Sequence, residues 1–384
     1  MDDFFACMNV NAAMGRYRLD LESEPFPMVQ DVRDARPGEL GDWESFLPAW
    51  EQKLASCDTS RAAVLRMEAL EWLEGIDAVS RLAREWQSLQ PYGYLFWIQR
   101  LEINKDWREM LGACQKALEI LPFNSFREQA AEYLVTAAMI LGEANFVLQG
   151  KRERFLSAPG EKNLLELLEE AENQNLRSRE LDAVLAHKEA IKGQGDGRGG
   201  LLLKVLLMAG RLDEAFNEGK NEKTVGWSFG NGGILYAGVL SALTGNSQQA
   251  KTIDTLLKEY ADRITSTIGG NPKKKQDLYT EIVKGLASLE LTQAEKRQYL
   301  VWAGKVGRDR AEHIVSNQHR TAYDRAARAL GALAECYVLA NEWDKAKSLL
   351  HEFIQVKFRR HHAFQAEVKR VVGSSLLLRD LRVV

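Results

Sequence analysis

The stretch "PYGYLFWIQRLEINKDWREMLGACQKALEILPFN", residues 91 to 124, decides the fold. Apolar side chains recur in it at the three- and four-residue spacing of an α-helix, first at Tyr94, Trp97, Ile98 and Leu101. After the polar "NKD", a second apolar stripe follows at Trp107, Met110, Leu111, Cys114, Ala117 and Leu118. Pro122 then prevents the second helix from continuing. These 34 residues therefore predict two helices joined by a short turn.

The same arrangement of an apolar helix, a turn and a second helix recurs along the chain. Small side chains let the second helix approach the first closely, and the matching positions are Ala144, Ala215, Ala250 and Ala346. Two helices in 34 residues resemble a tetratricopeptide repeat, and such pairs stack in series so that each buries its apolar face against its neighbours. The alternation of period two that is typical of strands is nearly absent. We therefore expect an all-α fold, a tetratricopeptide-like helical-repeat solenoid (an α-α superhelix).

The composition is that of a folded chain with an uneven distribution of charge. Of the 384 residues, 45% are apolar and 27% are charged, and the formal net charge is −3. This balance gives no overall electrostatic attraction to nucleic acid or membrane. Residues 271 to 384, however, hold 21 Lys and Arg against 13 Asp and Glu, whereas the first 270 residues hold 30 against 41. The sequence therefore predicts an acidic body with a basic end.

The cysteines and the N-terminal residues indicate which cell compartment and which cofactors to expect. Cys7, Cys57, Cys114 and Cys336 lack the spacing of a redox pair or a zinc cluster, so we expect reduced, mostly buried thiols and neither a metal nor a cofactor. The first residues lack the basic and apolar segments of a secretory signal. No run approaches the roughly 18 apolar residues that a membrane helix needs. We expect a cytoplasmic protein without membrane association.

Shifts in composition divide the chain into four parts. Residues 1 to 41 hold three of the eight prolines and no helical stripe, which predicts an irregular N-terminal arm or cap. Glycine-rich stretches at 192 to 200 and 226 to 233, and "GGNPKKKQD" at 269 to 277, interrupt the helical pattern. The remaining parts are predicted to be N-terminal repeats at 42 to 192, middle repeats with Gly-rich loops at 193 to 270, and basic C-terminal repeats at 271 to 384.

Several of these helical segments resemble a bacterial family. "AEHIVSNQHRTAYDRAARALGALAECYVLANEWDKAKSLL", "VKFRRHHAFQAEV", "FREQAAEYLVTAAMILGE", "KRERFLSAPG" and "LLLKVLLMAGRLDEAF" are similar to the helical region that accompanies the SWIM-type zinc finger. The similarity covers roughly residues 90 to 370. The finger itself, Cys-x-Cys followed by Cys-x-His, has no counterpart in this sequence. The resemblance therefore implies a helical scaffold without the zinc site.

Two short stretches imitate enzyme motifs. "GWSFG", residues 226 to 230, fits the G-x-S-x-G turn that exposes a nucleophilic serine, here Ser228. Gly195, Gly197 and Gly200 fit the G-x-G-x-x-G of dinucleotide-binding loops. Both motifs belong to parallel sheets, and the sequence lacks the alternating strands and helices that would build one. We therefore interpret both as loops between helices, and a serine hydrolase that uses Ser228 is kept as an alternative.

A polar stretch, "SNQHRTAYDRAARAL" at residues 316 to 330, is interpreted as the surface side of one helix. Arg320, Asp324 and Arg328 have the i, i+4, i+8 spacing that predicts a charge ladder along one helix face. The neighbouring apolar stripe, expected to face the core, is Tyr323, Ala326, Ala327, Leu330, Leu333, Ala334 and Tyr337. His319 lies too far around such a helix from Asp324 to pair with it, which argues against a catalytic dyad.

A second basic stretch, "KFRRHHAFQAEVKR" at residues 357 to 370, allows two interpretations. Its cations could complement the C-terminal end of a helix, or they could join the lysines at 273 to 275 in a surface that binds phosphate or an acidic partner. Adjacent histidines point to different helix faces, which argues against one shared metal. The candidate partner-binding residues are Arg320, Arg328, Lys357, Arg359, Arg360, His361 and His362.

The sequence favours a non-catalytic scaffold that binds a protein or peptide along the concave groove of the helical repeats. The first alternative is that the basic C-terminal region binds nucleic acid or a phosphate ligand. The second alternative is the serine hydrolase described above. No residue pattern identifies the partner.

Overall fold

The described part of the chain is helical almost throughout. The computed structural model describes residues 28–30, 43–57, 59–194, 200–222, 231–261 and 277–381. Within these ranges no residue forms a β-strand, which confirms the prediction of an all-α fold. None of the described helices is both long enough and apolar enough to cross a bilayer.

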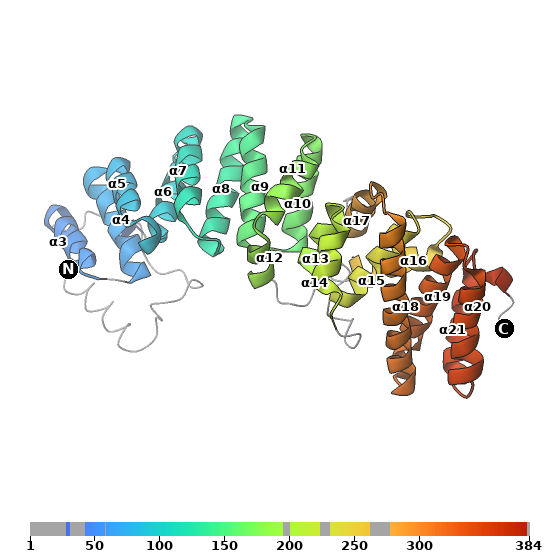
Figure 1. The fold of residues 1–384 in the computed structure, drawn as a ribbon. Coiled ribbons are helices and arrows are strands. Elements are labelled where there is room, and N and C mark those ends of the chain that lie inside the picture. The colour runs from blue at the N-terminus through green and yellow to red at the C-terminus, as the bar shows by residue number, and fades with distance from the viewer. Residues whose placement is uncertain are drawn as a thin grey trace. The chain divides into compact units, whose positions relative to one another are not determined.

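The chain divides into two compact units, Met1–Ala158 (unit 1) and Pro159–Val384 (unit 2). The sequence-predicted boundaries at 41, 192 and 270 each lie in or beside a stretch outside the described ranges, and they stay predictions. The helices of unit 1, drawn in blue to green in Figure 1, are α3 (Trp43–Ala55), α4 (Ser60–Glu74), α5 (Ile76–Trp86), η1 (Gln87–Leu89), α6 (Tyr92–Ile103), α7 (Trp107–Ile120), α8 (Ser125–Leu141) and α9 (Ala144–Ser157).

Unit 2 contains the remaining helices, from green to red in Figure 1. Those before residue 262 are α10 (Glu161–Asn173), α11 (Arg177–Leu185), α12 (Lys188–Gln194), α13 (Leu201–Met208), α14 (Leu212–Gly219), α15 (Asn231–Leu243) and α16 (Lys251–Ala261). Those after residue 276 are α17 (Leu278–Ala287), α18 (Gln293–Ser316), η2 (Arg320–Ala322), α19 (Tyr323–Leu339), α20 (Trp343–His351), the π-helical turn η3 (Glu352–Lys357), α21 (His362–Ser374) and η4 (Arg379–Leu381).

The helix pair predicted for residues 91 to 124 is confirmed as α6 and α7. Each of the four apolar residues predicted on the first helix is buried, and so are five of the six on the second, Trp107 being half-buried. Asp106 begins α7 by accepting a hydrogen bond from the Glu109 N–H at 3.2 Å, as an N-cap residue does. The helix ends at Ile120, two residues before Pro122.

Unit 1 is built of two layers of helices. Consecutive helices pack against each other from α3 to α9, and in addition α4 packs directly on α6 and α6 on α8. No comparable packing joins α5 to α7 or α7 to α9. Consecutive helices that pack together across such short connections run in opposite directions, so α4, α6 and α8 run parallel to one another. We call them the α4–α6–α8 layer.

The close helix approach predicted at Ala144 is wrong, whereas the three other predicted alanines are buried, as such an approach requires. Ala215, Ala250 and Ala346 are buried, but Ala144 is the exposed first residue of α9. The close contact between α8 and α9 lies instead at Gly150, where an added Cβ would come within 2.7 Å of Val135. Because Ala144 is exposed, it cannot be the residue at which α9 crosses α8.

Candidate interaction surfaces

The basic candidates of the C-terminal region gather at one end of unit 2. Side-chain contacts here join η3 to α18 and the first turn of α19 to the start of α21. The Lys357 ammonium lies 2.7 Å from Glu312 of α18. The Tyr323 and Phe364 rings, at the first turns of α19 and α21, meet edge to face with centroids 5.8 Å apart. We call this end the basic corner.

The seven candidate residues of the basic corner differ in how much of their charge is already paired. Arg328 forms ion pairs with Asp324 at 2.5 Å and with Glu259 at 3.3 Å. Lys357 is held by Glu312 and by Glu352, and these hydrogen bonds and charges raise its pKa although partial burial opposes the rise. These two cations therefore have structural partners.

The other five candidates are more available to a partner. Arg320, Arg359, Arg360 and His362 are exposed, and within the described ranges none of them forms an ion pair. His361 is half-buried, its ring lying edge to face with Phe358 at 5.3 Å and its Nδ1 having no hydrogen-bond partner among the described atoms. The corner thus offers three unpaired guanidinium groups to solvent.

The charge ladder predicted for residues 316 to 330 is wrong for its first residue, Arg320. The helix α18 ends at Ser316, and the chain turns through Gln318, whose φ of 54° lies in the left-handed region, before α19 begins at Tyr323. Arg320 therefore lies in the η2 turn and not on the helix of Asp324. The Asp324–Arg328 pair and the buried stripe from Tyr323 to Tyr337 are confirmed.

The side chain of Gln365 holds the η3 turn of the basic corner in place. The Gln365 side-chain amide donates hydrogen bonds to the carbonyl oxygens of Ile354, Phe358 and Arg359, at 3.2, 3.2 and 2.8 Å. The Phe358 carbonyl also accepts the His361 backbone N–H at 2.9 Å, so these hydrogen bonds join the end of η3 to the start of α21. The exposed arginines at 359 and 360 are therefore carried on a fixed backbone.

The enzyme-like motifs receive no structural support or contradiction. Ser228, Gly195, Gly197 and the lysines at 273 to 275 lie outside the described residues. Gly200 is described, and its φ of 59° places it in the left-handed region just before α13. Among the described side chains, no group of three or more His, Cys, Asp or Glu could hold a metal ion. Cys114 and Cys336 are buried free thiols, whereas Cys57 is exposed and Cys7 lies outside the described residues.

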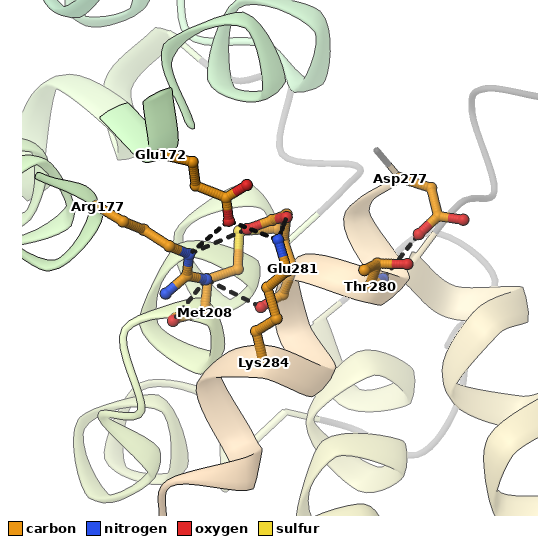
Figure 2. Close-up of polar contacts among 7 residues, drawn as sticks. All are labelled: Glu172, Arg177, Met208, Asp277, Thr280, Glu281 and Lys284. Atoms are coloured by element: carbon orange, nitrogen blue, oxygen red, sulfur yellow. Dashed lines mark hydrogen bonds and ion pairs between the residues drawn. The ribbon is translucent and has the colours of Figure 1, made fainter. Parts of the chain in front are cut away.

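A polar cluster around a buried glutamate in unit 2 joins four helices. Figure 2 shows Arg177 of α11 and Lys284 of α17 on either side of the Glu281 carboxylate, with Glu172 of α10 beside them. Glu281 is fully buried, and its oxygens lie 3.0 Å from Arg177 Nε and 2.7 Å from Lys284 Nζ. Arg177 also donates to the backbone carbonyls of Glu281 and Met208. Each charge already faces an opposite charge, so the cluster accounts for helix docking without a ligand.

A second surface lies on the α4–α6–α8 layer and was not predicted from the sequence. Large apolar side chains are exposed at the last turns of its helices: Ile103 on α6 is 65% exposed, and Met139 and Ile140 on α8 are 66% and 52% exposed. The signal for α8 was present in "YLVTAAMILGE", where apolar residues are too many for one helix face. An amphipathic helix buries only one stripe, so the excess must face something else.

Comparisons with known proteins add no assignment. No protein-family model matches the chain, and no curated protein is significantly similar to it.

Proposed function

We propose that the chain is a tetratricopeptide-like helical-repeat solenoid that acts as a non-catalytic scaffold and binds a protein or peptide along one layer of its helices. The observation that carries the proposal is the two-layer packing of unit 1, in which α4, α6 and α8 contact one another directly while α5, α7 and α9 do not pack together in this way. In a curved stack the helices on the inner side lie closer together. The α4–α6–α8 layer would then line the concave groove.

The spacing of contacts between neighbouring helix pairs supports the proposed repeat. Arg108, on the first turn of α7, forms an ion pair with Glu143, just before α9, and the two residues are 35 positions apart. Their equivalent places at the start of successive second helices fit a repeat of about 34 residues. Stacked pairs of this kind present a long surface that suits extended or helical peptides.

The proposal is tested by affinity capture with the purified full chain. Gln99 of α6 and Gln129 of α8 are exposed on the proposed groove layer, and the half-buried Gln115 of α7 is the control position on the other layer. A scaffold is expected to retain a protein in stoichiometric amount, to lose it on Gln99→Arg or Gln129→Arg, and to keep it on Gln115→Arg. Equal retention by all three variants, or no retained protein, would contradict the proposal.

The basic corner supports a second candidate function, the binding of nucleic acid or another phosphate ligand. The supporting observation is the set of exposed guanidinium groups of Arg320, Arg359 and Arg360, which have no ion pair within the described residues. Arginine recognises phosphate through paired hydrogen bonds. A gel-shift measurement at low salt tests it, because triple replacement of these arginines by alanine should abolish the shift and raised salt should weaken it. A shift that survives the triple replacement would remove this candidate.

A further inference from the structure

Three large apolar side chains are exposed together at one end of the α4–α6–α8 layer. Ile103 is the last residue of α6, and Met139 and Ile140 lie in the last turn of α8. The two helices run parallel and pack directly, so their C-terminal turns lie at the same end of the layer. A single exposed apolar residue is common, but a group on adjacent helices indicates an interaction site.

Acidic side chains flank these apolar residues. Glu102 precedes Ile103 on α6, and Glu132 lies two turns before Met139 on α8. Both carboxylates lie near Tyr133: burial raises the pKa of Tyr133, a hydrogen bond with Gln99 opposes the rise, and the charges of Glu102 and Glu132 add to it. Negative charges on two neighbouring helices therefore both act on one tyrosine. We call Glu102, Ile103, Glu132, Met139 and Ile140 the α6–α8 patch.

The arginines on the helices of this layer do not neutralise the patch. Each of the four arginines on α4, α6 and α8 is already engaged: Arg66 pairs with Glu51 at 2.7 Å, Arg100 with Glu71 at 2.7 Å, Arg127 with Glu153 at 2.6 Å, and Arg61 is buried with contacts of its own. In the described part of unit 1, no ion pair involves Glu102 or Glu132. Counted over the whole sequence, unit 1 has 17 Lys and Arg against 25 Asp and Glu, a net charge of −8.

We infer that the α6–α8 patch binds an amphipathic helix of a protein partner, with apolar side chains against Ile103, Met139 and Ile140 and with Lys or Arg beside Glu102 and Glu132. The inference rests on the proposed function and adds the chemical class of the partner. Burial of the three apolar side chains supplies the attraction, and the opposite charges fix the orientation and disfavour acidic partners. Nucleic acid and anionic lipid carry the same sign of charge as the patch, so both are repelled from it.

A pair of synthetic peptides tests the charge class. The first is a labelled helix of about 20 residues with leucines on one face and lysines on the other, and its twin has glutamate in place of each lysine. Fluorescence anisotropy with the full chain is expected to give the lysine peptide a dissociation constant at least about tenfold lower than that of the twin. Equal binding of the two peptides, or failure of the lysine peptide to bind, would overturn the inference.

Matched variants separate the patch from the overall charge of the protein. Glu102→Gln with Glu132→Gln is expected to weaken the lysine peptide at least about fivefold. The control, Glu109→Gln with Glu119→Gln, changes the net charge equally but on exposed positions of α7, and it should change the affinity by less than about twofold. An equal loss of affinity in the two double variants would mean that peptide binding depends on net charge alone. The α6–α8 patch would then not be the binding site.

The apolar part of the patch is tested in the same assay. Ile103→Ser with Ile140→Ser should weaken the lysine peptide about tenfold or more, because the removed area can no longer be buried. Leu89→Ser is the control, since Leu89 is 91% exposed and precedes α6 at its opposite end. An unchanged affinity of the double variant contradicts the inference. If the capture experiment gives a protein that is lost on Gln99→Arg or Gln129→Arg while the lysine peptide does not bind, the proposed scaffold function is retained and only the inferred class of partner is wrong.

Discussion

The Glu335 carboxylate on α19 accepts hydrogen bonds from the Thr252 hydroxyl at 2.7 Å and from the Thr252 backbone N–H at 3.0 Å, and so closes the first turn of α16. The Ile253 N–H and the Ser375 hydroxyl donate to the same carboxylate. Amide groups at a helix start have no partner within the helix, so a buried helix start needs an acceptor from elsewhere. One side chain therefore ties together α16, α19 and the end of α21.

Replacement of Glu335 should destabilise unit 2 strongly. Glu335→Ala leaves the donors of Thr252, Ile253 and Ser375 without an acceptor, and we expect a loss of about 3 kcal/mol in the free energy of unfolding. Urea unfolding followed by circular dichroism measures it. Asp344→Ala, at an exposed position on α20, is the control and should stay within about 0.5 kcal/mol of the parent chain. Similar losses for the two variants would refute the capping role.

The same residue predicts a pH dependence of stability. Burial raises the pKa of Glu335, although the hydrogen bonds from Ser375 and Thr252 partly oppose the rise. Because the folded state then binds this proton more tightly than the unfolded chain, the contribution is greatest at low pH and declines as the pH rises through the raised pKa. The free energy of unfolding of the parent chain, minus that of Glu335→Gln, should therefore fall from about pH 4 to about pH 8. An increase of this difference over the same pH range would mean that the pKa of Glu335 is lowered and not raised.

Glycine at position 285 is required by the docking of α17 on the end of α13. An added Cβ would lie 2.3 Å from the carbonyl oxygens of Leu207 and Met208, which are backbone atoms and cannot move aside as a flexible side chain does. Gly285→Ala should therefore lower the free energy of unfolding by about 1 to 3 kcal/mol. Gly112→Ala on α7 meets no atom within 4 Å and should instead raise it by up to about 1 kcal/mol. Thermal unfolding of both variants tests this prediction. Equal shifts in melting temperature would contradict the close approach of α17 to α13.

The buried pair of Arg177 and Glu281 should show strong coupling. Arg177→Met leaves the fully buried Glu281 with Lys284 as its remaining close cation, and we expect a loss of about 3 kcal/mol. Glu281→Met with Arg177→Met removes both charges and should recover part of that loss. A double-mutant cycle in urea gives the coupling energy directly. Simple additivity of the two single changes would indicate that the pair does not interact.

In the basic corner, loss of the exposed arginines should affect stability less than loss of Gln365, which caps the turn that carries them. Arg359→Ala with Arg360→Ala removes exposed side chains and should change stability by less than about 0.5 kcal/mol. Gln365→Ala removes hydrogen bonds to three carbonyl groups and should lose about 1 kcal/mol or more. Thermal melts of the two variants provide the comparison. A larger loss from the arginine pair would assign them a structural role.

Local patterns were sufficient to predict the helices but not their long-range contacts. The pair at 91 to 124 follows from apolar spacing, the Asp106 cap and Pro122, each of which acts within a few residues. The break between α18 and α19 was missed because the chain turns through Gln318 with a positive φ and without glycine or proline. Turn geometry of this kind leaves no reliable mark on the sequence.

The candidate sites were predictable only in part. The two basic stretches that form the basic corner were each visible in the sequence, but their proximity was not. Thr252 lies 83 positions from Glu335, and Arg177 lies 104 positions from Glu281. A carboxylate inside the apolar run "ALAECYVLA" signals a buried acceptor but does not name its donors. The α6–α8 patch was missed because periodicity identifies apolar residues without saying which of them the neighbouring helix leaves exposed.

Site-specific photo-crosslinking in cells tests the account most directly. A photoreactive amino acid replaces either Thr136, on the groove layer of unit 1, or Lys116, on α7. The account predicts a discrete crosslinked protein partner from position 136 and none from position 116. Equal crosslinking from both positions, or a partner captured from position 116 alone, would contradict it.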